Sequence, residues 1–246
     1  MITVTILTKN SSKYLRQVLN ALIHFDEVLI FDNGSSDSTL DIAEGYPNVR
    51  IVKGDFEGFG PTHNRASSLA KNNWILSIDS DEVVTPEMSK EVLSVKLEDD
   101  CVYSFTRHNF FNDRWIRWCG WYPDRQIRLY NRTITRFTDA QVHEAIIVND
   151  LRHISFESPI IHYSYETISD FLLKMQSYST LFAVQNCGKK KSSPFKAFSH
   201  GVFAFFKSYI LKRGILGGYE GFVISSYNAH TAFYKYLKLY EANTRH

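Results

Sequence analysis

Apolar runs and segments of helical periodicity alternate through the first third of the chain. The runs are rich in β-branched residues, which is typical of buried strands. They occupy residues 2–8 (ITVTILT), 27–32 (EVLIFD), 49–54 (VRIVKG) and 74–79 (WILSID). Helical spacing of apolar residues follows between Tyr14 and Leu22 and is expected again over residues 62–72. This alternation predicts an α/β fold with a mostly parallel sheet and helices on both of its faces.

The pattern changes near Cys101. Three further strands are predicted, at residues 102–111, 125–131 and 140–148. The last 60 residues have helical patterning, and the segment KKKSSP at 189–194 is a plausible hinge before them. We therefore divide the chain into a first domain of residues 1–186 and a helical C-terminal region of residues 187–246.

Charge supports the same division. The net charge of +2 combines 18 Lys+Arg and 24 Asp+Glu in residues 1–186 with 10 and 2 in residues 187–246. A basic region of this kind is expected to meet an anionic partner. Phe195, Phe198 and Val202 follow helical spacing within it. That stripe predicts either a helix packed on the body of the protein or an amphipathic face on an anionic membrane.

The sequence gives only a weak indication of the cellular compartment. The chain has 3 cysteines, too few and too scattered for a disulfide framework or a zinc site. The start of the sequence, MITVTILTKN, lacks the basic region of a signal peptide, and no apolar stretch approaches the roughly 20 residues that span a bilayer. We expect a cytoplasmic protein that is peripheral on the inner face of the cytoplasmic membrane.

Polar residues stand where the predicted parallel strands end. Thr8, Asp32 and Asp79 each close such a strand, and ligands of parallel α/β sheets bind beyond these carboxyl ends. The segment GFGPTHNRA lacks the GxGxxG signature because His63 occupies the third position, but its Arg65 could neutralise a phosphate. The alternatives are a capped turn at Asp32 and a surface or paired arginine at position 65.

Three carboxylates crowd into four residues of the segment WILSIDSDEVVTP. Asp79, Asp81 and Glu82 follow its apolar strand, and like charges at this spacing repel unless they are hydrated or paired. A solvated turn would satisfy them. A divalent cation would also do so, because Mg²⁺ and Mn²⁺ prefer clustered oxygen ligands and retain substrate phosphates in their coordination shell.

Two later segments carry further candidates. His143 and Glu144 lie in the apolar run VHEA, and a carboxylate near a cleft can act as a general base. His162 follows the apolar start of PIIHYSY and is a candidate metal ligand. An edge-strand carboxylate and a buried, hydrogen-bonded histidine are the structural alternatives.

The ordered set TILTKN, FDNGSSDST, HNRA, WILSIDSDE, VHE and IIHYSY resembles the inverting family-two glycosyltransferases of the GT-A fold. The similarity is greater to bacterial glucosyltransferases of the lipopolysaccharide inner core, and it extends to YILKRGILGGYEGF near the end of the chain. The resemblance implies a Rossmann-like sheet and transfer of a hexose, glucose foremost, from a UDP-sugar to a lipopolysaccharide or lipooligosaccharide core acceptor. The sequence departs from the family pattern after Asn10, where relatives often carry Glu.

The same resemblance assigns roles to individual residues. It places Thr8, Asp32, Arg65 and Asp79 at the nucleotide-sugar. It makes Asp81 and His162 ligands of Mg²⁺ or Mn²⁺. It makes Glu144 the catalytic base, with His143 as the other candidate.

Partners and alternatives complete the expectations. A lipid-linked glycan acceptor and an anionic membrane surface suit the basic aromatic tail, and the catalytic half has no recognised nucleic-acid motif. The segment IDSDEVV also fits the DxDx[TV] signature of haloacid-dehalogenase-like phosphatases. A non-catalytic nucleotide- or glycan-binding module is the second alternative.

Overall fold

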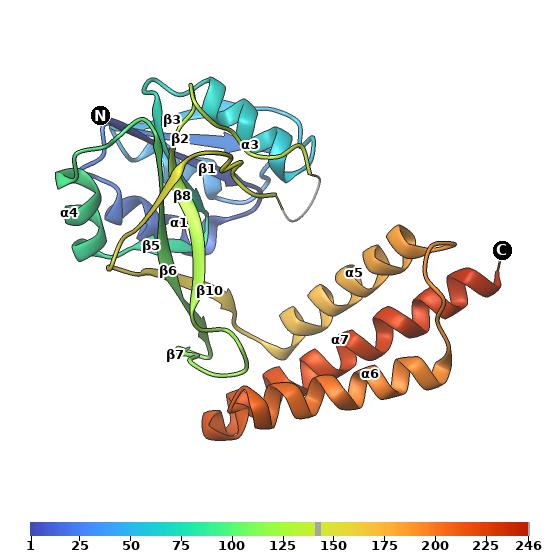
Figure 1. Cartoon of the computed structure of the whole chain (residues 1–246). Coiled ribbons are helices and arrows are strands. Elements are labelled where there is room, and N and C mark those ends of the chain that lie inside the picture. Colours follow the sequence, from blue (N-terminus) through green and yellow to red (C-terminus); the bar gives the residue numbers. More distant parts are fainter. Residues whose placement is uncertain (141–143, 246) are drawn as a thin grey trace. The chain divides into compact units, whose positions relative to one another are not determined.

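The computed structural model describes residues 1–140 and 144–245 (Figure 1). These fold into two compact units. The first comprises Met1–His108 and Asp124–His162, and the second Asn109–Pro123 and Tyr163–His246. These units are defined by packing, whereas the predicted division after residue 186 was supported by charge. The helix α5 (Ile168–Asn186) therefore belongs to the second unit but to the first predicted domain.

The first unit begins with the predicted parallel strands. They are β1 (Ile2–Thr8), β2 (Glu27–Asp32), β3 (Val49–Lys53) and β4 (Trp74–Asp79). Their order in the sheet is β3-β2-β1-β4, and each neighbouring pair is parallel. Every residue of β2 is buried, which agrees with a strand covered on both faces. The prediction of an α/β fold is confirmed.

Helices connect these parallel strands, and such crossovers are right-handed as a rule. The helices α1 (Ser12–Ala21) and α2 (Thr39–Glu44) lead outward along the sheet from β1 to β3, and α3 (Phe59–Ser68) leads back to β4. Because a right-handed crossover places its helix according to the direction of travel, α3 covers the face opposite to α1 and α2. A fourth helix, α4 (Pro86–Ser94), begins as predicted, with Thr85 Oγ1 accepting a hydrogen bond from the Met88 N–H at 3.2 Å.

The sheet continues with antiparallel pairs. The strand β8 (Asp124–Asn131) pairs antiparallel with both β4 and β6 (Cys101–Phe111). The short β5 (Glu82–Val84) pairs antiparallel with β10 (Ile160–Tyr165), so that His162 lies opposite Glu82. The remaining strands, β7 (Arg114–Trp115) and β9 (Arg152–Ser155), pair with β6.

One predicted strand is wrong. Within 140–148 the described residues form only an isolated bridge, between Ile146 and Phe137. The segment instead folds back locally, since the Thr138 N–H donates to the Ala145 carbonyl and the Ala145 N–H donates to Thr138 Oγ1. The apolar run that predicted a strand is satisfied by burying Ile146 in the core with Phe137.

The second unit is mainly helical, as predicted for the end of the chain. It contains α5, α6 (Pro194–Phe206), a π-helical turn η1 (Lys207–Leu211), a 3₁₀ turn η2 (Gly214–Gly217) and α7 (Gly218–Thr244). Both α5 and α6 pack against α7 (Figure 1). Ser193 caps α6 with Pro194 at its first position, so the KKKSSP segment does precede a helix. Across the described part of the chain, none of the helices has the length and apolar character needed to span a bilayer.

Candidate functional site

The first candidate residues meet where β1 and β2 end. Thr8 lies opposite Asp32 in the parallel register, and its Oγ1 donates to Asp32 Oδ1 at 3.1 Å. Asp32 also accepts from the N–H groups of Gly34 and Ser35, each at 3.0 Å, and from Ser35 Oγ. A carboxylate offers about four lone-pair sites. The carboxylate of Asp32 is therefore satisfied within this turn.

Burial and hydrogen bonding act oppositely on this aspartate. Burial raises the pKa of Asp32, but the hydrogen bonds from Ser35, Thr8 and Gly34 outweigh it and leave the pKa lowered. The residue is only 1% exposed. Asp32 thus holds the turn after β2 in shape as an ionised group, which is the capped-turn alternative, and contact with a nucleotide stays a prediction.

The HNRA segment of α3 fastens the chain near Phe137. The Asn64 side chain donates to the Phe137 carbonyl at 3.0 Å and accepts from the Phe137 N–H at 2.9 Å. The His63 ring stacks on the Phe137 ring with centroids 4.5 Å apart. Arg65, the residue singled out from the sequence, is half exposed and pairs with Glu57 at 2.7 Å. Its role at a phosphate stays a prediction.

Two arginines that the sequence analysis missed neutralise part of the carboxylate cluster. Glu82 is fully buried, and its Oε1 accepts from Arg128 at 3.1 Å and from Arg107 at 3.2 Å. Asp79 accepts from Arg128 at 2.7 Å, and its Oδ2 lies 3.8 Å from Arg107. Arg107 also pairs with Asp124 at 2.8 Å. Three carboxylates therefore share two guanidinium groups.

This network fixes the charge of Asp79. Burial raises the pKa of this carboxyl, but Arg128 above all, then His63, His162 and Arg107, lower it to about 2. Burial acts against the charge of Arg128 too, yet Asp79 and Glu82 raise its pKa above the ordinary value. The acidic cluster consequently needs no metal ion to balance Asp79 and Glu82.

Asp81 faces a different partner. Its Oδ2 lies 3.6 Å from Nε2 of His162, and the two side chains are 38% and 13% exposed. The strand pairing of β5 with β10 creates this meeting by setting His162 opposite Glu82. The structure thus brings together the two residues predicted as metal ligands, from segments 81 positions apart along the chain.

Glu144 is half buried and lies outside regular structure, directly before Ala145, whose backbone is bonded to Thr138. The same segment contacts the start of α3, because the Gly60 N–H donates to the Ala140 carbonyl at 3.1 Å. A Cβ at Gly60 would lie only 1.9 Å from the Thr138 carbonyl oxygen, so only glycine permits this approach. His143 lies outside the described residues.

The donor set of Asp81 and His162 fits a divalent cation. A carboxylate oxygen and an imidazole nitrogen within 4 Å of each other can coordinate one ion, and their partial exposure leaves positions for a ligand's phosphates. A second acidic cluster, Glu98, Asp100 and Cys101, is different because Arg152 pairs with both carboxylates. Geometry therefore favours Asp81 and His162 as the cation site.

Known structures share this fold. The S. aureus TarS 1-349 structure in complex with UDP-GlcNAc aligns with a TM-score of 0.51 and 15% identity, over 93% of this chain and 90% of that one. The mannosyltransferase PcManGT from Pyrobaculum calidifontis, in complex with GDP-Man and Mn²⁺, aligns with a TM-score of 0.51 and 12% identity, over 93% and 73%. At these identities the similarity establishes the GT-A type of fold.

Sequence comparison is more specific. An uncharacterized glycosyltransferase of Rickettsia felis is 30% identical over 267 residues, covering 98% of this chain and 90% of the relative. The lipopolysaccharide core biosynthesis glycosyltransferase LpsC of Rhizobium meliloti is 22% identical over 247 residues, covering 96% and 90%. Residues 3–155 match the model of glycosyl transferase family 2, and this match excludes the phosphatase alternative. The chain belongs to glycosyl transferase family 2.

Proposed function

We propose that this glycosyltransferase moves a hexose, glucose foremost, from a UDP-sugar to a lipopolysaccharide or lipooligosaccharide core acceptor, with inversion at the anomeric carbon. The observation that carries the proposal is the pair of Asp81 and His162, 3.6 Å apart beside an acidic cluster that is otherwise neutralised by arginines. That pair is a cation site suited to a diphosphate leaving group.

The nucleotide-sugar would occupy the carboxyl ends of the parallel strands. Thr8, Asp32, Arg65 and Asp79 are the residues proposed to meet its uridine and phosphates. A UDP donor is supported by the TarS complex with UDP-GlcNAc. The lipopolysaccharide acceptor is supported by the similarity to LpsC.

Asp81 and His162 would hold Mg²⁺ or Mn²⁺. The Mn²⁺ in the PcManGT complex supports a divalent ion in this fold. When bound, the ion offsets the negative charge that develops on the departing diphosphate. The chain contributes the ligands, and the arginine-bound Asp79 beside them is ionised and fixed in position.

Glu144 is the proposed base, with His143 as the other candidate. It accepts the proton of the acceptor hydroxyl as that oxygen bonds to the anomeric carbon. The bond from the anomeric carbon to the diphosphate oxygen breaks in the same displacement, and its electrons leave with UDP. An α-linked donor thereby gives a β-glycoside.

The acceptor is proposed to be lipid-linked, and the enzyme to work at the inner face of the cytoplasmic membrane. The support is the positive charge of residues 187–246, which contain 10 Lys+Arg and 2 Asp+Glu. A phosphorylated, membrane-anchored glycan and anionic lipid headgroups both complement such a surface.

The test measures release of UDP from UDP-glucose, UDP-galactose and UDP-N-acetylglucosamine, and release of GDP from GDP-mannose for comparison. Each donor is assayed with Mn²⁺, Mg²⁺ or EDTA. We expect metal-dependent release from one UDP-sugar, and a loss of at least roughly 100-fold in Asp81→Asn. Asp41→Asn, which removes a carboxylate from the surface of α2, is the matched control and should retain activity.

Two outcomes would count against the proposal. Stabilisation by UDP without turnover, even with lipopolysaccharide core acceptors present, would favour the non-catalytic binding module. Full activity of Asp81→Asn, or full activity in EDTA, would refute the cation site.

A further inference from the structure

Large apolar side chains are exposed around the turn that joins α6 to α7. Phe203, Phe206, Leu211 and Leu216 are between 56% and 70% exposed, and Ile210, Ile215, Tyr219 and Phe222 are about half exposed. Single exposed apolar residues are ordinary, but a group of this size on one hairpin marks a surface that another body covers. We call residues 203–222 the apolar turn.

The exposed charges of the apolar turn are all positive. Lys207, Lys212 and Arg213 are exposed in the apolar turn. Its sole acidic residue, Glu220, is 8% exposed and accepts from Arg114 at 3.0 Å and from Asn112 at 3.1 Å. The only other acidic residue after position 186 is Glu241, near the C-terminal end of α7, where it pairs with Arg245. The apolar turn therefore presents positive charge and buries its one carboxylate.

Glycines fix the shape of this turn. A Cβ at Gly221 would lie 1.9 Å from the Gly214 carbonyl oxygen, and one at Gly214 would lie 2.8 Å from Cys119 Sγ. The Cys119 N–H donates to the Lys212 carbonyl at 2.9 Å, which ties the turn to the loop beneath it. Small residues thus fill the inner side of the turn, and the leucines and isoleucines remain outside.

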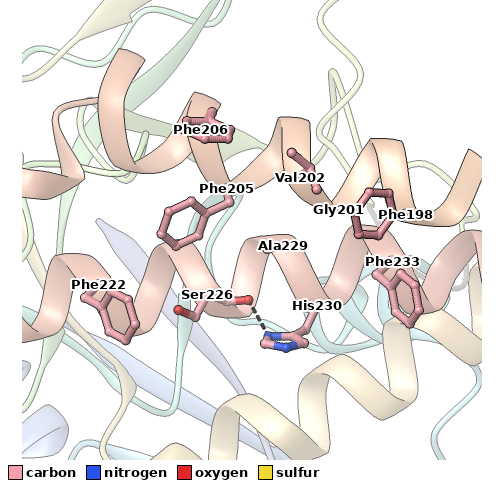
Figure 2. A pocket seen from close by; sticks show the side chains of 10 residues that line it. All are labelled: Phe198, Gly201, Val202, Phe205, Phe206, Phe222, Ser226, Ala229, His230 and Phe233. Carbon is pink, nitrogen blue, oxygen red and sulfur yellow. Dashed lines mark hydrogen bonds between the residues drawn. The ribbon is translucent and has the colours of Figure 1, made fainter.

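An apolar groove runs between α6 and α7 next to the turn (Figure 2). Its volume is about 410 Å³, and the rings of Phe198, Phe205, Phe222 and Phe233 line it. The backbones approach closely at Gly201, where a Cβ would lie 3.2 Å from Phe233 Cβ. The groove and the apolar turn share Phe205, Phe206 and Phe222, so they form one continuous surface.

We propose that the apolar turn is a membrane-docking site, which inserts Phe203, Phe206, Leu211 and Leu216 into an anionic lipid bilayer. Lys207, Lys212 and Arg213 then contact the lipid phosphates, and the adjoining groove receives part of an acyl chain. The inference rests on the proposed function for its purpose, since a lipid-linked acceptor lies in the same membrane. The evidence for docking is the set of exposed apolar and basic side chains of the apolar turn.

Charge decides between a bilayer and a second copy of the chain as the covering body. Two copies meeting through the apolar turn would bring six exposed cationic side chains together without exposed carboxylates from either turn. Like charges in an interface are repulsive. An anionic bilayer supplies both an apolar interior and the complementary charge.

The test is sedimentation of the full chain with phosphatidylcholine vesicles, with and without phosphatidylglycerol, in the absence of donor and acceptor. We expect binding only to the anionic vesicles. Leu211→Ser with Leu216→Ser should weaken it at least about tenfold, because less apolar surface inserts. Lys207→Gln with Lys212→Gln should weaken it roughly thirtyfold, from about fivefold for each basic residue at an anionic surface.

Matched controls locate the effect. Leu172→Ser with Leu173→Ser removes equally exposed leucines from α5, and Lys90→Gln with Lys96→Gln removes the same charge from exposed positions outside residues 187–246. Both should bind as the unchanged protein does. Equal weakening by a control pair would overturn the proposal, as would absence of vesicle binding or a dimer that the leucine substitutions dissociate. Vesicle binding without UDP release would refute the proposed function and leave the docking site standing.

Discussion

The two units place charge and apolar surface in opposite ways. The first unit buries charges: Glu82 is fully buried, Arg128 is 6% exposed, and each pairs with the other and with a third group. The second unit exposes apolar residues, with Leu211 70% exposed. Burying a charge loses the free energy of its hydration, and exposing apolar surface forgoes the stabilising free energy of burying it. Each departure from the usual arrangement therefore indicates where the unit meets something other than water.

The largest effect is expected from removing a half-buried charge of the first unit. Glu144→Gln keeps the size of the side chain and removes the proposed base, so transfer should fall roughly 10²–10⁴-fold. The free energy of unfolding should change little, because Glu144 is only half buried and lies outside regular structure. Transfer rates and urea unfolding measure the two effects. Unchanged transfer would move the role of base to another residue.

Next in size is the loss of a buried charge partner. Arg128→Met leaves Asp79 without its 2.7 Å partner, and it leaves Glu82 with one guanidinium, that of Arg107, besides the Asp79 N–H. Breaking a buried pair in this way costs about 3–5 kcal/mol of stability. Arg245→Met, which breaks the exposed pair with Glu241, should cost no more than about 1 kcal/mol. Urea unfolding of both variants measures the contrast, and equal losses would show that the network contributes nothing to folding.

A third prediction concerns pH. Burial lowers the pKa of His63 to about 4, and Asp79 offsets this only in part. The unfolded chain binds the proton near pH 6.5 and the folded chain does not, so this residue makes stability fall as pH drops from about 6.5 to about 4. We expect a loss of about 2 kcal/mol between pH 7.5 and pH 5, measured by urea unfolding.

The control for this effect is His63→Phe, which keeps an aromatic ring against Phe137. Its baseline stability will differ because the contact of His63 with Ser77 Oγ is lost, so the slope with pH is the quantity compared. The slope should be nearly flat over the same range. A slope equal to that of the unchanged protein would assign the pH dependence to other groups.

The smallest expected effect concerns the second unit. Leu211→Ser with Leu216→Ser should change the free energy of unfolding by no more than about 0.5 kcal/mol for each substitution, since both side chains are exposed. Leu29→Ala, at a fully buried position of β2, should cost about 2–5 kcal/mol. A large loss from the exposed pair would mean that the apolar turn serves folding.

Periodicity was sufficient for the parallel half of the sheet. The four predicted strands recur almost residue for residue. In β1, β2 and β4 the reason is burial on both faces, which imposes an uninterrupted apolar run, whereas the edge strand β3 is only partly buried. The same criterion failed at 140–148, where Ile146 is buried without belonging to a strand. An apolar run indicates that its residues are buried, and residues can be buried without forming the hydrogen-bonded pairs of a strand.

The site was predicted only in part, for a related reason. Asp81 and His162 were recognised through a family resemblance and do meet. Arg107 and Arg128 were missed because they lie 25 and 46 positions from Glu82, a separation at which no local pattern operates. The available signal was weak: Asp124, Gln126 and Arg128 stand at alternate positions of the predicted strand, which in a regular strand share one face.

Asn64 has a consequence beyond its two hydrogen bonds. One amide group answers both the N–H and the carbonyl of Phe137, a task that needs a donor and an acceptor on the same short side chain. Aspartate has the shape but lacks the donor, and leucine lacks both. Together with the Gly60–Ala140 hydrogen bond and the stacking of His63 on Phe137, Asn64 thereby ties the helix that carries Arg65 to the segment that leads to Glu144. These contacts would keep the proposed donor-side residue Arg65 and the proposed base Glu144 at a fixed spacing.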